Sequence, residues 1–175
     1  SSTRLAIVAV LLAAAALAVS EWLEQTNILH TWISLDEEHN DLRIFFLYIT
    51  EAIQLVIPGL MQKTESAISG AELPPFKDLL YIFFNDLCEL EQELILVLDD
   101  YHKIDEEKVH EVVNEWLRFP PPNVHLSIIT RRDPAIAGID SLRTSGRLTE
   151  IRMETLAFTR DEIVRLFKQL LDIEL

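Results

Sequence analysis

The sequence contains little glycine and cysteine, and no apolar run long enough to cross a membrane. Its 175 residues include 4 glycines and a single cysteine, Cys88. One cysteine excludes an internal disulfide and fits a reducing compartment. The longest apolar run, residues 5–19, is shorter than the roughly 18 residues expected of a membrane-spanning helix. We therefore expect a cytoplasmic protein without a membrane-spanning segment.

Positive charge is also scarce. The chain has 15 Lys and Arg against 29 Asp and Glu, and its formal net charge is −14. Because binding to DNA or RNA phosphates depends on clustered Lys and Arg, this domain alone is not expected to bind nucleic acid. The 5 histidines are scattered and no Cys/His cluster has zinc spacing, so no structural metal is expected. The acidic surface instead suits solubility or contact with a partner.

Apolar residues make up 49% of the chain, which is enough for one packed domain spanning residues 1–175. Strand and helix patterns alternate along it, so we predict an α/β fold, a three-layer sandwich with a mainly parallel sheet. Apolar spacing predicts helices over 41–57, from Phe76, and after Asp105, which can cap the third, whereas short apolar runs predict strands at 94–98, 123–130 and 147–153. A strand is also expected near residue 30, and Thr159 begins a capping box for a last helix.

Several single residues receive structural interpretations. Trp32 and Trp116 are expected in the core, and Cys88 on the apolar side of its helix is expected to pack there. The segment from Lys63 to Pro75 is the most linker-like part of the chain. No special role is expected for His30, His39, His110 and His125.

Two structures compete for the N-terminal run. Residues 5–10 can form a central strand with a tight entry into a helix, or one helix can extend from near Arg4 to Glu24. The alanines favour the helix. The β-branched and aliphatic residues at 5–10 favour the strand, which we predict.

Polar residues follow two of the predicted strands, at the edge where parallel sheets bind ligands. Asp99 and Asp100 follow one apolar run, and Thr130 and Arg131 follow the next. Two carboxylates suit a hydrated magnesium ion, with Asp99 holding the ion and Asp100 orienting or deprotonating a water molecule. Arg131 could sense a terminal phosphate through its planar guanidinium group. A solvated acidic loop that caps the next helix explains the two aspartates equally well.

Four segments together resemble the nucleotide-binding domain of MalT-type regulators, which are signal-transducing ATPases of the STAND class. In that family the domain is usually followed by a sensor domain and a LuxR-type helix-turn-helix. The resemblance runs from about Ser20 to Leu175 and implies a P-loop NTPase-like core with magnesium and ATP or ADP as ligands. It implies that Asp99 and Asp100 match the Walker B acids and that Arg131 matches the arginine after the sensor strand. The segments are "TWISLDEEHND", "LILVLDDYHKI", "VHEVVNEWLRFPPPNVHLSIITRRDP" and "GRLTEIRMETLAFTRDEI".

The chain departs from this family in residues 1–24. The family has a Gly-x-Gly-Lys-Thr-Thr loop, whose lysine position falls on Ala15, with Ala14 and Ala16 in place of glycine and threonine. A phosphate cradle needs glycines for its backbone geometry, a lysine for the β- and γ-phosphates and a hydroxyl for magnesium. We therefore expect impaired or absent nucleotide binding and an inactive ATPase.

Three functions stay open from the sequence. The domain can be a regulatory module that has lost its nucleotide, a working magnesium-ATP domain without the usual loop, or a structural or interaction scaffold that self-associates. The loss of the loop has two explanations, redesign of the domain and natural degeneration.

Overall fold

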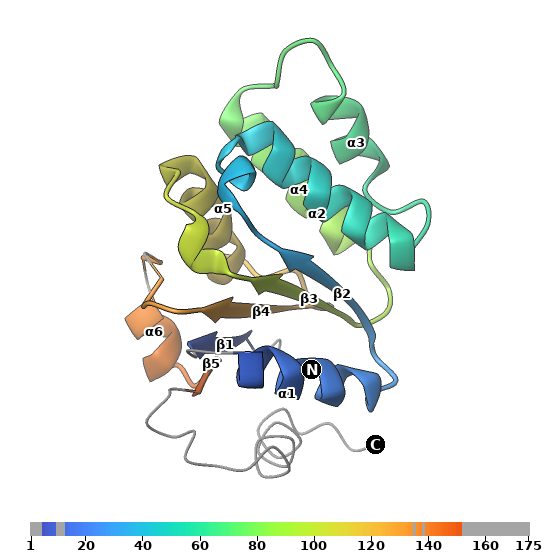
Figure 1. Cartoon of the computed structure of the whole chain (residues 1–175). Helices are drawn as coiled ribbons and strands as arrows, with labels where there is room; N and C mark the ends of the chain where they lie inside the picture. The colour runs from blue at the N-terminus through green and yellow to red at the C-terminus, as the bar shows by residue number, and fades with distance from the viewer. Residues whose placement is uncertain (1–4, 10–12, 135, 138, 152–175) are drawn as a thin grey trace.

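The structure, a computed structural model, describes residues 5–9, 13–134, 136–137 and 139–151. Its strands and longer helices follow one another in the order that the apolar pattern predicts, and two short helices, 62–68 and 139–144, were not expected (Figure 1). The strands are β1 (Leu5–Ala9), β2 (Leu29–Ser34), β3 (Leu94–Asp99), β4 (Val124–Thr130) and β5 (Leu148–Ile151). The helices are α1 (Ala13–Glu24), α2 (Leu42–Val56), α3 (Gln62–Ile68), α4 (Phe76–Cys88), α5 (Glu107–Arg118) and α6 (Ile139–Thr144).

The strands form one sheet in the order β2-β3-β4-β1-β5, and every neighbouring pair is parallel. The predicted α/β fold with a parallel sheet is therefore confirmed. Strand β1 lies between β4 and β5, so the strand at the start of the chain is also confirmed and the single helix from Arg4 to Glu24 is excluded. This strand supplies backbone partners to both β4 and β5, which one long helix at this position could not do.

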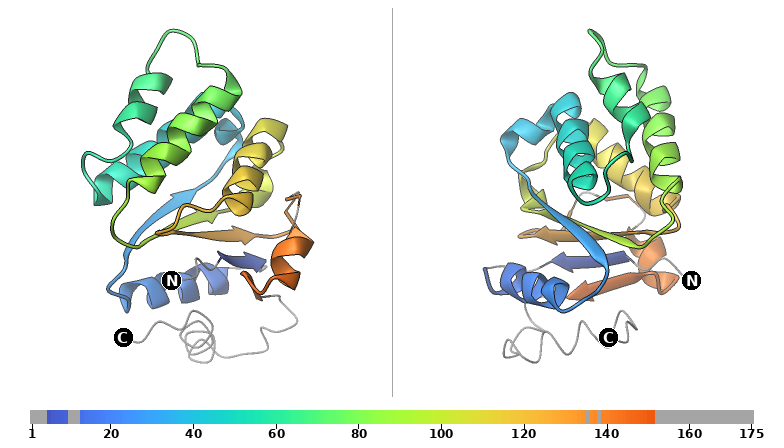
Figure 2. Two further views of the ribbon diagram at one scale, coloured as in Figure 1. Left: turned by 180° about the vertical axis from the view of Figure 1, so that it is seen from behind. Right: turned by 90° about the vertical axis from the view of Figure 1, so that its right-hand side faces the viewer.

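Helices cover both faces of the sheet. The right-hand view in Figure 2 shows α1 on one side of the sheet and α5 on the other. Helices α2, α3 and α4 gather beyond the β2 edge (Figure 1). This arrangement follows from right-handed crossovers, because the chain moves in one direction across the sheet from β1 to β2 and in the opposite direction from β3 to β4. The result is a three-layer sandwich.

Strand β3 is buried along its apolar length, as expected for an internal parallel strand. Successive side chains point to opposite faces. Leu94, Leu96 and Leu98 join the large core formed with α2, α4 and α5. Ile95 and Val97 are buried on the side of α1.

Aromatic rings join the helices above this core. The ring of Phe83 on α4 lies 5.0 Å from that of Phe46 on α2 and 5.5 Å from that of Trp116 on α5, edge to face in both cases. Trp116 is 1% exposed, which confirms its predicted place in the core. Trp32 is only half-buried.

Part of the segment predicted to be linker-like, Lys63 to Pro75, is instead an ordered helix. Helix α3 occupies residues 63–68 of it, and Thr64 is buried. The buried carboxylate of Asp86 on α4 accepts hydrogen bonds from the backbone N–H of Thr64 and from its hydroxyl, both at 2.8 Å. Lys63 also forms an ion pair with Glu89, the residue that directly follows α4. Polar composition suggested a linker because these partners lie more than twenty residues away in the sequence.

Two further predictions were wrong. Glu106, not Asp105, caps α5, because its side chain accepts the N–H of Lys108. Cys88 is exposed rather than packed, because its neighbour Leu87 takes the inward position in the last turn of α4. Strand β5 ends at Ile151, and the expected capping box at Thr159 lies outside the described residues.

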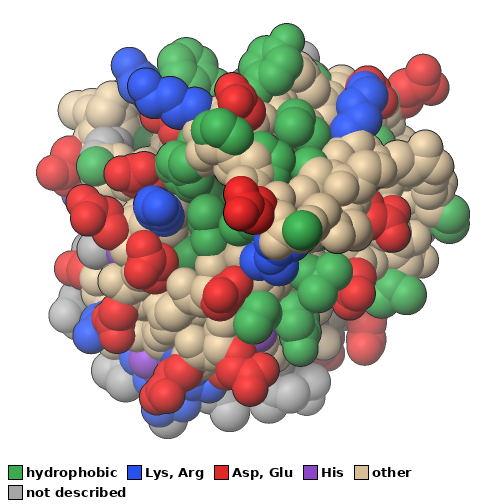
Figure 3. All heavy atoms as spheres, turned by 90° about the horizontal axis from the view of Figure 1, so that it is seen from above, with side chains coloured by type: hydrophobic (Ala, Val, Ile, Leu, Met, Phe, Trp, Pro, Cys, Tyr) green, Lys and Arg blue, Asp and Glu red, His purple; other side chains and the backbone are tan. Residues whose placement is uncertain are grey.

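Some large hydrophobic side chains stay at the surface. Seen from above, green side chains gather between acidic and basic ones (Figure 3). Within the described ranges, no helix is both long and apolar enough to cross a membrane. Among the residues whose burial is described, the exposed large hydrophobic ones are Leu47, Tyr48, Leu55, Tyr81 and Phe119.

Replacing Trp116 by Ala should lower the free energy of unfolding by about 3–5 kcal/mol, because it removes a fully buried ring that α4 packs against. The matched change is Phe119→Ala at the end of the same helix, where the ring is 63% exposed. It should cost less than about 0.5 kcal/mol. Urea unfolding measures both. Equal losses would show that the core does not depend on Trp116.

Replacing Asp86 by Ala should lower the free energy of unfolding by about 1.5–3 kcal/mol, because a buried N–H and a buried hydroxyl of Thr64 lose their acceptor. Asp78→Ala on the exposed side of the same helix is the control. Urea unfolding is again the measurement. A loss no larger than that of Asp78→Ala would contradict a role for Asp86 in fixing α3.

Candidate functional site

The predicted site residues lie at the carboxyl edge of the sheet, where all five strands end. The strand register places Ala9 opposite Thr130 and Leu98 opposite Ile128. The ends of β1, β3 and β4 therefore share this edge. Asp99 is the last residue of β3, and Arg131 follows β4 directly.

Asp99 is a half-buried carboxylate that the surrounding backbone holds in place. Its Oδ1 accepts the N–H of Asp100 at 2.7 Å, and its main-chain carbonyl accepts the N–H of Leu35 at 2.9 Å. The side chain of Trp32 on β2 also hydrogen-bonds to it. Burial raises the pKa of Asp99. Asp99 thus places a carboxylate at the end of β3, and carboxylate oxygens are among the ligands that magnesium binds.

Asp100 is already engaged by its own loop. Its Oδ2 accepts a hydrogen bond from Nζ of Lys103 at 2.8 Å, and Nδ1 of His102 lies 3.8 Å from Oδ1. The hydrogen bond from Lys103 lowers the pKa of Asp100. A carboxylate with a lowered pKa is a weaker proton acceptor, so this arrangement opposes the predicted activation of a water molecule by Asp100.

The backbone at Asp100 is left-handed, with φ 56° and ψ 31°. Aspartate tolerates this conformation better than most residues, because its short side chain can form local hydrogen bonds. The reversal lets a 3₁₀ turn, Tyr101–Lys103, start directly after the strand. This turn explains how Lys103 returns to the carboxylate three residues before it.

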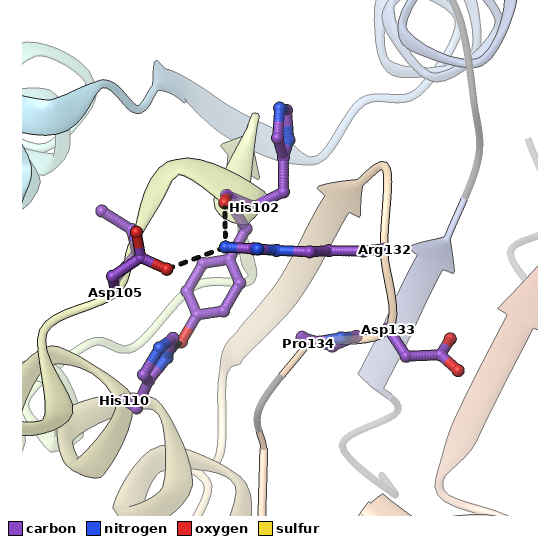
Figure 4. Close-up of a pocket in the computed structure, with 8 residues that line it drawn as sticks. His102, Asp105, His110, Arg132, Asp133 and Pro134 are labelled. Carbon is purple, nitrogen blue, oxygen red and sulfur yellow. Dashed lines mark hydrogen bonds and ion pairs between the residues drawn. The ribbon is translucent and has the colours of Figure 1, made fainter.

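Two neighbouring arginines behave differently. Arg131, the predicted phosphate sensor, is exposed, although its charge contributes to the lowered pKa of Asp100. Arg132 is the anchored one: its guanidinium donates to the carbonyl of His102 at 2.7 Å and to Asp105 at 2.8 Å (Figure 4). The Thr130 hydroxyl donates to the carbonyl of Arg132 at 2.8 Å. The turn after β4 is therefore tied to the loop after β3.

A pocket of about 310 Å³ opens beside this junction. The Tyr101 hydroxyl and Nδ1 of His110 lie 2.7 Å apart at its wall. Burial raises the pKa of Tyr101 and lowers the pKa of His110, so both groups favour their neutral forms. Arg132 lies between His102 and Asp105, whereas the carboxylate of Asp133 points away from them (Figure 4).

Sequence reasoning missed the residues that hold the site together. Asn40 accepts the N–H groups of Asp105 and Glu106 and donates to the carbonyl of Lys103, so it links the β2 end to the loop after β3. His39 is buried and forms a capping box with Asp36. One local signal was available: Lys103 lies three residues after Asp100 in a turn, a spacing at which the two side chains can pair. No local pattern indicates the partners of Asn40, which lie more than 60 residues away.

The start of α1 does not fit a nucleotide phosphate. Helix α1 begins at Ala13, so Ala14, Ala15 and Ala16 are already helical where a phosphate loop would need glycines, a lysine and a hydroxyl. Among the described residues, no three His, Cys, Asp or Glu side chains are placed to hold a metal ion. A magnesium ion at this edge would depend on Asp99 with little support from other protein ligands.

No family model matches the chain. It is similar to the HTH-type transcriptional regulator MalT of Yersinia pestis (strain Pestoides F), at 34% identity over 151 residues, which cover 86% of this chain and 16% of the regulator. The protein of the same name from Yersinia pseudotuberculosis serotype O:1b gives the same values. The one from Yersinia enterocolitica serotype O:8 is 33% identical over 157 residues, which cover 90% of this chain and 17% of that protein.

The chain thus spans about a sixth of the length of the curated relatives it matches. The similarity extends over most of the chain, and the structure has the α/β fold with a parallel sheet that the family resemblance implies. This chain is a MalT-like domain.

Proposed function

We propose that this domain is the signalling module of a MalT-type ATP-dependent transcriptional regulator, in a form whose nucleotide binding is impaired or lost. The longer protein would act in the cytoplasm and would carry a sensor domain and a DNA-binding helix-turn-helix domain. Within it, this domain would pass a conformational signal without hydrolysing ATP. Two alternatives, a working ATPase and a passive scaffold, give different results in the experiment below.

One observation carries the proposal: β1 ends at Ala9 and α1 begins at Ala13. The residues between them are Val10, Leu11 and Leu12, which bring no glycine, charge or hydroxyl. The first N–H groups of a helix can attract an anion. Without the lysine and the glycines of the family's phosphate loop, that attraction is too weak to hold a triphosphate in competition with water.

The remaining acidic pair supports loss of chemistry rather than retention. Lys103 occupies the carboxylate of Asp100, and Arg132, which follows the predicted sensor Arg131, is used to fix the loop at Asp105. These contacts give the carboxyl edge a structural role that needs no ligand. Asp99 keeps the position of a magnesium ligand without the residues that would hold the phosphates.

Titration calorimetry with magnesium-ATP should give no binding heat at millimolar nucleotide for the unmodified chain. A variant that restores the loop, with Leu12→Gly, Ala14→Gly, Ala15→Lys and Ala16→Thr, should bind at least about tenfold more tightly, a gain of ~1.4 kcal/mol. The same graft with methionine at position 15 is the matched control and should not bind. Circular dichroism verifies that each variant is folded.

The outcomes separate the three functions. If the unmodified chain binds magnesium-ATP at micromolar concentration and Asp99→Asn abolishes this binding, the proposal is overturned in favour of a working ATP domain. No binding by the grafted, folded variant would show that the rest of the edge cannot hold a nucleotide, which favours the scaffold. Binding only after grafting supports the proposal.

Replacing Lys103 by Met should raise the pKa of Asp100, because its main hydrogen-bond donor is lost. A lowered folded-state pKa contributes stability above the unfolded value of about 3.9, and this contribution disappears as the pH falls through the folded value. As the pH falls from about 5 to about 2, the free energy of unfolding of the variant should therefore decrease less than that of the unmodified chain.

Urea unfolding across that range, with carboxyl NMR of Asp100, measures the effect. Lys108→Met on the exposed side of α5 is the control, and its stability should vary with pH as that of the unmodified chain does. If the plots of unfolding free energy against pH are parallel for Lys103→Met and the unmodified chain, the ion pair between Lys103 and Asp100 does not form in solution.

A further inference from the structure

A groove between α4 and α5 lies away from the carboxyl-edge site and has no part in the proposed function. Its volume is about 760 Å³. Phe76, Leu80 and Phe84 of α4 form one wall, each packed against the core on its inner side. Phe119, at the end of α5, contributes to the other. The groove is thus a mainly apolar surface with a rigid base.

Two large side chains along this groove remain in solvent. Tyr81 is 71% exposed and Phe119 is 63% exposed. The guanidinium of Arg118 lies 5.1 Å from the Phe119 ring centre and braces it from one side. Contiguous exposed apolar surface rimmed by polar residues is typical of an interaction site.

The groove follows the whole length of α4. Its lining residues on that helix, from Phe76 to Cys88, recur at intervals of three and four. A 13-residue helix is about 20 Å long at ~1.5 Å per residue, so the groove matches roughly three to four turns of a second helix. Binding of an amphipathic helix to a groove of this kind relies on apolar anchors at the same spacing.

The α5 side of the groove offers hydrogen-bond acceptors and negative charge. Glu111 and Glu115 line it, and Glu115 is only loosely paired, 3.6 Å from Arg118. Between them, the buried Oδ1 of Asn114 accepts no hydrogen bond within the part of the chain that the structure describes. The described lining residues include one cation, Lys77, at the amino end of α4 on the opposite wall. The chemistry of the α5 wall therefore calls for donors and positive charge.

We propose that this groove binds an amphipathic helix of a protein partner, whose apolar stripe packs against Phe76, Leu80, Phe84 and Phe119 and whose Lys or Arg side chains face α5. The charge of −14 on the chain adds long-range attraction for such a partner. Burial of apolar side chains provides the affinity. The carboxylates of α5 attract the basic side of the partner helix and so determine the orientation in which it binds.

The test uses two synthetic helical peptides of about 14 residues, four turns. Both carry leucine at helical spacing; one has lysines beside this stripe, and the other has glutamates at the same positions. Fluorescence anisotropy should show that the lysine peptide binds at least about tenfold more tightly than the glutamate peptide. The double variant Glu111→Lys with Glu115→Lys should reverse that preference.

Two independent readouts locate the binding. Phe119→Ala should weaken the lysine peptide at least about fivefold, with an unchanged unfolding midpoint. Cys88 is the only cysteine, is exposed and lines the groove, so bound peptide should slow its reaction with a small thiol reagent. Unchanged reaction of Cys88 with peptide bound would place the peptide elsewhere and overturn the proposal.

Other outcomes also decide the question. Equal affinity for the two peptides, or no binding of either, would overturn the charge-selected docking site. Sedimentation that shows a dimer weakened by Phe119→Ala would assign the groove to a second copy of the chain instead. A monomer that binds the lysine peptide selectively supports the proposal.

Discussion

The structure depends on the burial of β3 on both faces of a parallel sheet. Leu94, Leu96 and Leu98 face the large core, and Ile95 and Val97 face the side of α1. Such a strand is stable only when helices cover both sides, and crossovers of one hand then place those helices. The carboxyl ends of all strands consequently meet at one edge, which positions Asp99 and the turn after β4 together.

That edge combines the acidic end of β3 with a helix, α1, that begins in a run of alanines. Helix α1 starts at Ala13 because a run of alanines favours helix over a loop that wraps an anion. The groups that remain are engaged with one another: Lys103 with Asp100 and Arg132 with Asp105. The first pair lies within the loop after β3, and the second joins this loop to the turn after β4.

The two ends of α5 contribute to different surfaces. Glu106 caps its start beside the carboxyl edge, where Asn40 also holds the loop. Phe119 at its end, together with Glu115, lines the groove against α4. Trp116 packs the middle of the helix against Phe83. A change at the carboxyl edge that shifted α5 would therefore alter the groove, which gives a partner bound there a physical connection to that edge.

Much of the fold could be predicted from the sequence by itself, because apolar periodicity is a local property. It determined that residues 94–98 form a buried strand, that 41–57 and the segment after Phe76 are helical, and that Asp99 follows a strand end. The β-branched residues at 5–10 likewise determined a strand despite the alanines that follow.

Only the tertiary structure decided which polar residues act together. Thr64 finds Asp86 across 22 residues, and Arg132 finds Asp105 across 27, so neither pair has a local signal. The same limit explains why Lys63–Pro75 resembled a linker, why no sequence signal indicated that Arg132 ties two loops together, and why Cys88 was expected in the core. Burial and hydrogen bonding depend on which distant segments meet, and those meetings are set by the packing of the sheet and its helices.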